Sequence, residues 1–298
     1  LKTVKEQGNV VSVSTGNPVI AYGERSIGAI LVRAGRLTPE NTERILRLQR
    51  EQNLSFGEAG IKLGLLTQAD IEFALSLQFN YPYLLRGESK LSEDLVAAYT
   101  RSGPQLEALR ALRSQLMLRW FDGADRKALA IISGERREGR SFIAANLAVV
   151  FSLLGERTLV IDADMHYPRQ HALFGLENRA GLSAVLSGRG GPELMQRIPG
   201  LLDLSVLPAG VLPPNPLELL AQPLFAQLLK ELRSEFDVIL LDTPASASFA
   251  DAQTIAGHAG AALIVARKNV SRKWRVRGVS DSVTHESITI VGSVLNDS

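Results

Sequence analysis

The sequence predicts an α/β fold: a doubly wound, mostly parallel sheet around a phosphate-binding loop, preceded by a small duplicated helical domain. Three observations lead to this prediction. A glycine-framed loop lies between an apolar strand and a long apolar helix. Two later apolar strands end in carboxylates. The first third of the chain repeats itself, which is typical of a duplicated supersecondary unit.

The loop has the sequence SGERREGRS and follows a strand-like run at 128–132. Gly134, Gly139 and Ser141 keep the frame G-x-x-x-x-G-K-[ST], while Arg140 stands in the lysine position. Such glycines let backbone N–H groups and the following helix N-terminus meet a phosphate, and the serine hydroxyl is placed for magnesium. An accidental glycine-rich turn is the alternative.

Two buried strands are expected to bring carboxylates to the same site. The apolar run within 157–168 ends at Asp162 and Asp164, and the run within 236–244 ends at Asp242. Ligands bind at the carboxyl ends of parallel strands, so these side chains should converge with the loop. Magnesium accepts such a set of few carboxylates, waters and phosphate oxygens. For each aspartate alone, a helix N-cap is the alternative.

An internal repeat with a period of 29 residues occupies the first third of the chain. Each copy predicts a short helix, a G-x-L-T turn and an amphipathic helix, with Thr38 and Thr67 as N-caps. The positions that recur are Ser26, Gly28, Gly35, Leu46 and Gln49, which return as Ser55, Gly57, Gly64, Leu75 and Gln78.

Composition is that of a globular protein, with 45% hydrophobic and 21% charged residues among 298. The absence of cysteine excludes disulfides and thiolate metal sites, and it suits a reducing compartment. No run approaches the roughly 20 apolar residues that cross a bilayer. We expect four parts: a mobile tail at 1–22, a tandem-repeat helical regulatory or docking domain at 23–84, a connector at 85–103 with one short helix, and the phosphate-loop domain at 104–298.

The formal net charge is only +2, but one segment near the C-terminus is strongly basic around Trp274. A solvated helix face, a docking face for a membrane partner's cytoplasmic tail, and contact with anionic lipid or nucleic acid are the alternatives, nucleic acid being the less expected. The cations are Arg267, Lys268, Arg272, Lys273, Arg275 and Arg277.

Seven segments of the chain occur in an order that is typical of one family: PQLEALRALRSQL at 104–116, the loop, IDADMHYP, GLSAVLSG at 181–188, LPAGVLPPNPLELL at 207–220, LLDTP, and GSVLN at 292–296. In these segments about the last two thirds of the chain resembles bacterial tyrosine kinases of the exopolysaccharide chain-length-determinant type. The wider superfamily, the MinD/ParA-type ATPases, shares the loop and strands but lacks the NPLELL and E-x-x-R-x-x-R signatures.

The resemblance implies a MinD/ParA-like P-loop fold and a protein-tyrosine kinase that uses Mg-ATP to regulate exopolysaccharide chain length and export. Asp164 would be the base, with Arg140 and Asp242 also catalytic. Ser141, Asp162 and Asp242 would hold magnesium. The residues that would bind ATP are Gly134, Glu138, Gly139, Arg140, Ser141, Phe142 and Asn296, the last at the adenine edge.

The resemblance also implies a cytoplasmic protein that lies at the inner face of the membrane through a transmembrane polysaccharide chain-length determinant. Self-association would use Glu107, Arg110 and Arg113, the E-x-x-R-x-x-R residues. These residues share one helix face only loosely, so a solvated charged stripe is the alternative.

Three departures from the family bear on activity: Arg140 replaces the loop lysine, His166 replaces the arginine of D-x-D-x-R, and no tyrosine follows Tyr167. Tyr167 is expected to be held near the site, whereas tyrosines near the connector could be phosphorylated in trans. Otherwise the domain would be a catalytically weak ATP-binding scaffold of the export complex, or a ParA/MinD-like positioning ATPase. The remaining tyrosines are Tyr22, Tyr81, Tyr83 and Tyr99.

The repeat resembles the tandem motifs at the N-terminus of type II secretion and pilus-assembly ATPases, some of which bind cyclic di-GMP. In that motif an arginine stands where this chain has Ser26 and Ser55. The alternatives are a cyclic di-GMP site and a small helical protein-docking module.

Overall fold

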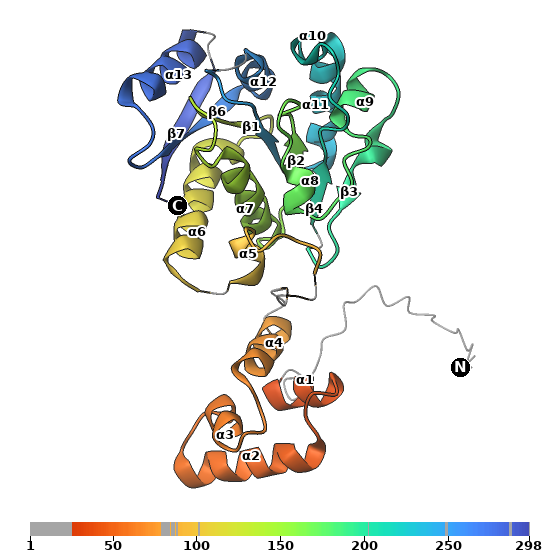
Figure 1. Cartoon of the computed structure of the whole chain (residues 1–298). Helices are drawn as coiled ribbons and strands as arrows, with labels where there is room; N and C mark the ends of the chain where they lie inside the picture. The colour runs from red at the N-terminus through yellow and green to blue at the C-terminus, as the bar shows by residue number, and fades with distance from the viewer. Residues whose placement is uncertain are drawn as a thin grey trace, which may run out of the picture. The chain divides into compact units, whose positions relative to one another are not determined.

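The chain forms two compact units, residues 1–81 and 82–298. They are drawn in Figure 1. The expected tail at 1–22 lies outside the described residues, as do Tyr22, Tyr81 and Tyr83. This computed structural model describes residues 26–78, 84, 87, 89–100, 102–201, 203–247, 250–285 and 288–297.

The described part of the first unit consists of two helix pairs, one for each copy of the repeat. Helix α1 packs mainly against α4, and α2 packs mainly against α3, so each copy completes the other's core. Leu31, Ile45 and Ala59 are fully buried at the centre. The helices are α1 (Ile27–Arg33), α2 (Pro39–Gln52), α3 (Phe56–Lys62) and α4 (Gln68–Gln78).

The recurring polar residues of the repeat begin its helices. The hydroxyls of Ser26, Thr38, Ser55 and Thr67 each accept a hydrogen bond from the backbone N–H three residues later, at 3.2–3.3 Å. This confirms Thr38 and Thr67 as N-caps. Ser26 and Ser55, which hold the arginine positions of the related motif, therefore serve their own helices.

The second unit contains a seven-stranded sheet in the order β3-β4-β2-β5-β1-β6-β7. Every neighbouring pair is parallel except β3 and β4, which confirms the predicted doubly wound, mostly parallel sheet. The strands are β1 (Ala128–Ile132), β2 (Thr158–Asp162), β3 (Gln196–Arg197), β4 (Leu204–Leu207), β5 (Val238–Asp242), β6 (Ala261–Arg267) and β7 (Thr289–Asn296).

Helices cover both faces of this sheet (Figure 1). Alternate residues of β1 divide between two cores: Leu129 and Ile131 face α5–α7, and Ala130 and Ile132 face α9–α13. No helix within the described ranges is long and apolar enough to cross a membrane. The helices are α5 (Val96–Tyr99), α6 (Pro104–Leu116), α7 (Arg140–Ser152), α8 (Gln170–Leu173), α9 (Leu182–Leu186), α10 (Pro216–Leu220), α11 (Pro223–Glu235), α12 (Asp251–Ala259) and α13 (Lys273–His285), with a π-turn at Met117–Phe121 and a 3₁₀ turn at Pro192–Leu194.

Residues 89–100, within the expected connector, are part of the second unit and pack into its core. Leu95 and Ala97 are fully buried, and the Ala97 N–H donates to Asn146 Oδ1 on α7 at 3.0 Å. The Tyr99 hydroxyl donates to the Leu91 carbonyl at 2.8 Å. Tyr99, a candidate for phosphorylation in trans, is therefore packed within the fold, because the apolar residues around it are part of the core.

Candidate functional site

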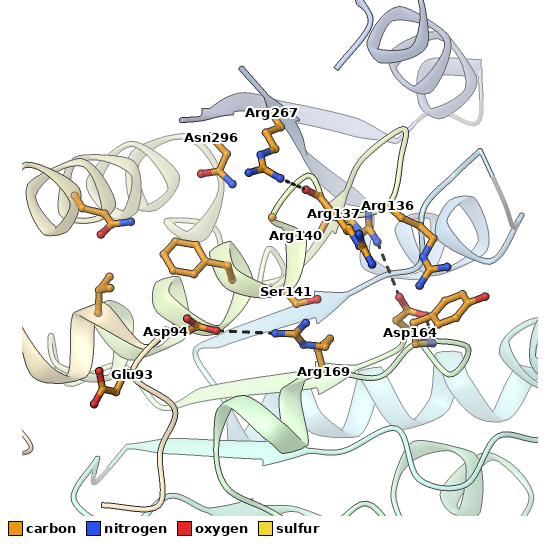
Figure 2. Close-up of a pocket in the computed structure, with 15 residues that line it drawn as sticks. Glu93, Asp94, Arg136, Arg137, Arg140, Ser141, Asp164, Arg169, Arg267 and Asn296 are labelled. Carbon is orange, nitrogen blue, oxygen red and sulfur yellow. Dashed lines mark hydrogen bonds and ion pairs between the residues drawn. The ribbon is translucent and has the colours of Figure 1, made fainter. Parts of the chain in front are cut away.

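A cleft of about 620 Å³ opens at the carboxyl end of the sheet, a volume in the usual range of ligand pockets. Figure 2 shows the loop arginines, Asp164 and Asn296 around it. Five arginines line the cleft against three carboxylates, so its field favours an anion. The arginines are Arg136, Arg137, Arg140, Arg169 and Arg267, and the carboxylates are Glu93, Asp94 and Asp164.

Most of the sequence-predicted site residues meet here. Gly139, Arg140, Ser141, Phe142, Asp164 and Asn296 line the cleft. Asp162 and Asp242 are fully buried next to each other, since their strands pair in register at these two residues. Gly134 lines a different, smaller cavity, because its Cα faces Arg275 and Val279 on α13.

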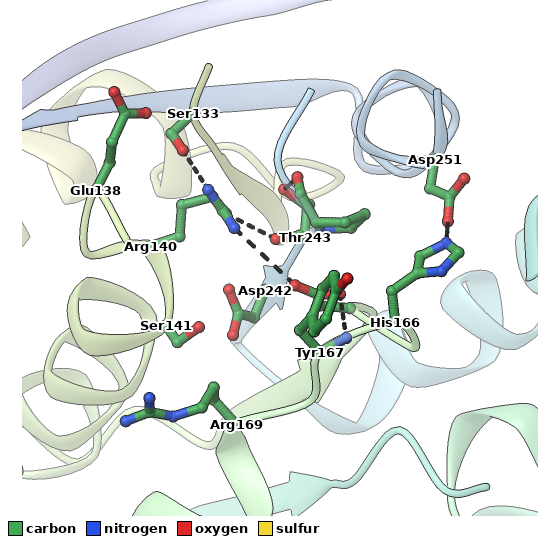
Figure 3. A network of polar contacts seen from close by, with 12 residues as sticks. Ser133, Glu138, Arg140, Ser141, His166, Tyr167, Arg169, Asp242, Thr243 and Asp251 are labelled. Carbon is green, nitrogen blue, oxygen red and sulfur yellow. Dashed lines mark hydrogen bonds and ion pairs between the residues drawn. The ribbon is translucent and has the colours of Figure 1, made fainter. Parts of the chain in front are cut away.

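Arg140 is almost completely buried, and its side chain is held by the loop and by the end of β5 (Figure 3). Its Nε donates to the Thr243 carbonyl at 2.8 Å. Its Nη1 donates to the Glu135 carbonyl at 2.8 Å and to Ser133 Oγ. Its Nη2 lies 4.0 Å from Asp164 Oδ2. Most of the guanidinium is therefore used by the protein itself, and Nη2 is the part that remains for a ligand.

Glu138 stabilises the loop from behind and does not reach the cleft. Its Oε2 accepts from the Glu135 N–H at 2.8 Å, and its Oε1 accepts from Ser271 Oγ. Asn296 Nδ2 donates to the Glu138 carbonyl at 3.2 Å. Gly139 has a φ of 101°, and a Cβ there would collide with the Asn296 amide, so only glycine fits.

Asp162 accepts backbone hydrogen bonds at the start of α8, but it is not the N-cap of that helix, because Arg169 holds that position. Asp162 Oδ2 accepts from the backbone N–H groups of Arg169 at 2.9 Å and Gln170 at 2.8 Å. The Gln170 side chain donates to Asp242 Oδ2 at 2.8 Å and to the Ser141 carbonyl at 3.1 Å. The second carboxylate oxygen of each aspartate, Oδ1, has no hydrogen-bond partner among the described residues.

Burial dominates the ionisation of these acids. It raises the pKa of Asp242 to about 6, against the lowering effect of the Arg140 charge and the Gln170 hydrogen bond. Burial, with the nearby Asp242 charge, also raises the pKa of Asp162 well above its ordinary value. Burial likewise raises the pKa of Asp164, while the Tyr167 N–H opposes this. A cation at the site would offset the cost of these negative charges.

The donor set fits magnesium. Asp162 and Asp242 each present an unsatisfied buried oxygen, and the Ser141 side chain is close enough to Asp242 to lower its pKa. Across the described ranges no group of three or more His, Cys, Asp or Glu side chains gathers as a metal site. Magnesium would therefore depend on these few oxygens together with water and phosphate, which is its usual preference beside nucleotides.

The side chains of Tyr167 and His166, which follow Asp164 in the chain, lie on opposite sides of this segment. The Tyr167 N–H donates to Asp164 Oδ1 at 2.9 Å, and the Tyr167 ring, 46% exposed, stacks under the Arg136 guanidinium at 3.5 Å. The structure thus places Tyr167 at the rim of the cleft. His166 pairs through Nε2 with Asp251 Oδ2 on α12 at 2.9 Å, on the other side of this segment.

Sequence reasoning missed Gln170 and Asn146. Both are fully buried, and Asn146 donates from Nδ2 to the Asp94 and Phe142 carbonyls at 3.0 Å. Asn146 could have been found, because it is an isolated amide in an otherwise apolar helix. Nothing in the sequence distinguishes Gln170 from an ordinary surface glutamine.

Comparisons with known proteins agree with this geometry. No family model matches the chain. The chain is 33% identical over 208 residues to the putative tyrosine-protein kinase EpsB of Ralstonia solanacearum, covering 70% of this chain and 28% of that protein. It is 34% identical over 192 residues to the putative tyrosine-protein kinase CapB of Staphylococcus aureus, covering 64% of this chain and 83% of that protein. The match spans only 26–29% of the length of several relatives.

Solved structures show the same fold. The kinase domain of Escherichia coli tyrosine kinase ETK superposes with a TM-score of 0.66 at 28% identity, covering 73% of this chain and 85% of that one. The cell division ATPase MinD of Pyrococcus furiosus superposes with a TM-score of 0.50 at 26% identity, covering 57% and 71%. Because its sequence matches most of a whole kinase relative and its fold matches a solved kinase domain, the chain belongs to the bacterial tyrosine kinases of the exopolysaccharide type.

Proposed function

We propose that the chain binds Mg-ATP in this cleft and transfers the γ-phosphoryl group to protein tyrosine, as a regulator of exopolysaccharide chain length and export. The observation that supports this most is the meeting of Ser141, Asp164 and the buried pair Asp162–Asp242 at the carboxyl ends of the strands. Phosphoryl transfer needs these parts: a phosphate cradle, a metal site and a base for the hydroxyl proton.

Each group has a role that follows from its position. Ser141 and the free oxygens of Asp162 and Asp242 would hold magnesium, which neutralises phosphate charge when bound. The loop N–H groups and the arginine rim would bind the phosphates. Asp164 would accept the tyrosine proton, because its raised pKa makes it a stronger base than an exposed aspartate.

A second function is favoured by Arg140 itself. Its Nε and Nη1 are already bonded to Thr243, Ser133 and Glu135. A cation held in this way reaches a phosphate less freely than a lysine ammonium would. In this alternative the domain binds ATP as a weakly active scaffold of an export complex.

A ParA/MinD-like positioning ATPase, the third possibility, rests on shared fold alone and would be detected by ATP-dependent DNA binding.

We further propose a transmembrane chain-length determinant as partner and self-association through α6. Helix α6 matches the predicted range 104–116 residue for residue. Glu107 is 60% exposed and pairs with Arg110 at 2.7 Å, whereas Arg113 donates to the Val150 carbonyl of its own chain at 3.0 Å. Of the three residues, Glu107 is thus the most available to another protomer.

The variant Asp242→Asn tests the metal site through stability. A folded pKa near 6 lies above the ordinary value near 4, so ionised Asp242 costs stability as pH rises from about 4 to 6. At pH 8 without metal, the free energy of unfolding of the variant should be about 1–3 kcal/mol larger than that of the parent. It should also lose the stabilisation that Mg-ATP gives the parent. Urea unfolding at pH 5 and pH 8 measures both effects.

For this test, an equal Mg-ATP stabilisation in the parent and in Asp242→Asn would show that the metal lies elsewhere. A metal-free variant that is less stable than the parent at pH 8 would contradict the account of the buried charge.

The variant Arg140→Lys separates the kinase from the scaffold. Lysine lacks the fork that bonds Thr243 and Glu135, so its ammonium is free to reach the phosphates, and turnover should stay equal or rise several-fold. Incubation with γ-labelled ATP, followed by mapping of phosphotyrosine, measures this. ATP binding without any phosphotyrosine, in both proteins, would support the scaffold. Complete loss of binding in Arg140→Lys would show that the arginine contacts are required.

The variant Glu107→Lys tests self-association. Reversing this exposed charge places like charges together at a contact that uses Arg110 or Arg113 of another protomer, so the mass in sedimentation should fall. Glu231→Lys, an exposed position on α11, is the matched control and should keep the parent mass. A monomeric parent, or equal masses in all three proteins, would leave only the solvated charged stripe.

A further inference from the structure

The basic segment at 267–277 has no part in the proposed chemistry apart from Arg267, which lines the cleft. It forms the turn after β6 and the first turns of α13, at the outer edge of the second unit (Figure 1). It contains six Lys or Arg residues, and no Asp or Glu occurs between Arg267 and Asp281. For a chain with a net charge of +2, this is a strong local concentration of positive charge.

Large apolar side chains are exposed among these cations. Trp274, in the first turn of α13, is 58% exposed, and Val270, in the turn before this helix, is 56% exposed. The opposite face of the helix packs into the core through Val279 and Val283. Lys273, Trp274 and Arg277 are all exposed, so an aromatic ring and cations occupy the same outer surface.

Most of these cations are not neutralised within the described part of the chain. Lys268 pairs with Asp297 at 2.8 Å, and Arg275 pairs with Glu135 at 3.0 Å. Arg272, Lys273 and Arg277 have no ion pair among the described residues, and Asp281 is the only acidic residue on the described part of α13. Three exposed positive charges therefore remain for a partner.

The surface is also held in a fixed shape. The Arg267 N–H donates to Ser271 Oγ at 2.7 Å, and the Ser271 hydroxyl in turn contacts Glu138 of the loop. Lys268 N–H donates to the Asn296 carbonyl at 2.8 Å. The turn that presents Val270 is thus fastened to both the loop and β7, so little ordering is needed before it binds.

We propose that this surface, residues 268–277, binds an anionic lipid bilayer, with Trp274 and Val270 at headgroup level and Arg272, Lys273 and Arg277 against the headgroups. Indole rings favour the interface between water and hydrocarbon, and juxtamembrane cations attract anionic lipids. A nucleic acid would satisfy the cations and could stack on Trp274, but its phosphates offer no apolar surroundings for Val270. Lipid is the partner that suits both components.

The chain allows a direct optical test because it has only two tryptophans. Trp120 is 8% exposed and donates from Nε1 to the Ala128 carbonyl at 2.9 Å, so it is shielded from added lipid. Vesicles of phosphatidylglycerol and phosphatidylcholine should shift the emission of the full chain to shorter wavelength, and brominated lipid should quench it. Vesicles of phosphatidylcholine alone should do neither. Trp274→Phe should abolish the shift.

Cosedimentation with the same vesicles measures the electrostatic part. Lys273→Glu with Arg277→Glu should weaken binding at least about tenfold, since each cation near an anionic surface strengthens binding about fivefold. Arg189→Glu with Lys230→Glu changes the net charge equally at exposed positions elsewhere and should bind almost as the parent does. Competition with soluble glycerol phosphate, which should not displace the protein, distinguishes a bilayer surface from a site for free phosphate.

Three results would overturn the proposal. The first is no binding to phosphatidylglycerol vesicles, and the second is binding without a change in Trp274 emission. The third is binding to duplex DNA that Lys273→Glu with Arg277→Glu abolishes, while vesicles remain unbound. No ATP is needed in any arm, so failure here leaves the proposed kinase function untouched.

Discussion

The burial of two neighbouring carboxylates at the ends of β2 and β5 is the constraint on which the site depends. Asp162 and Asp242 are fully inaccessible and lie side by side in the sheet register. Two negative charges in such a place are costly unless donors or cations compensate them. Gln170 supplies donors to both, and the Arg140 charge lowers the pKa of Asp242. The compensation is incomplete, because one oxygen of each acid has no hydrogen-bond partner in the described part of the chain.

Because the charges of the buried acids are only partly compensated, the arginine at position 140 has a structural role that a lysine would not have. The planar fork of Arg140 bonds the Thr243 and Glu135 carbonyls and still lies 4.0 Å from Asp164. It is therefore an internal counter-ion of the acidic cluster as well as a candidate phosphate ligand. A single ammonium could not make these contacts together. The same residue thus links the shape of the loop to the ionisation of the acids behind it.

Local patterns in the sequence were enough to predict several elements and to bring the candidate site residues to the carboxyl ends of the strands. The strand at 128–132 follows from its apolar pattern, and the caps Thr38 and Thr67 follow from capping chemistry. The helix at 104–116 was expected from the family resemblance. The direction of individual side chains could not be predicted. The Glu138 side chain contacts Ser271, a partner more than a hundred residues away in the chain. Tyr99 packs against the core, and its position depends on a whole helix face.

The ionisation of Asp242 tests the central claim most directly. Carboxyl ¹³C NMR titration can follow Asp242, first without metal and then with magnesium and a non-hydrolysable ATP analogue. The account predicts an apparent pKa near 6 without metal, and a fall to below the ordinary aspartate value near 4 once the magnesium complex binds. A metal-free pKa near 4, or a pKa near 6 that does not change when the complex binds, would contradict it.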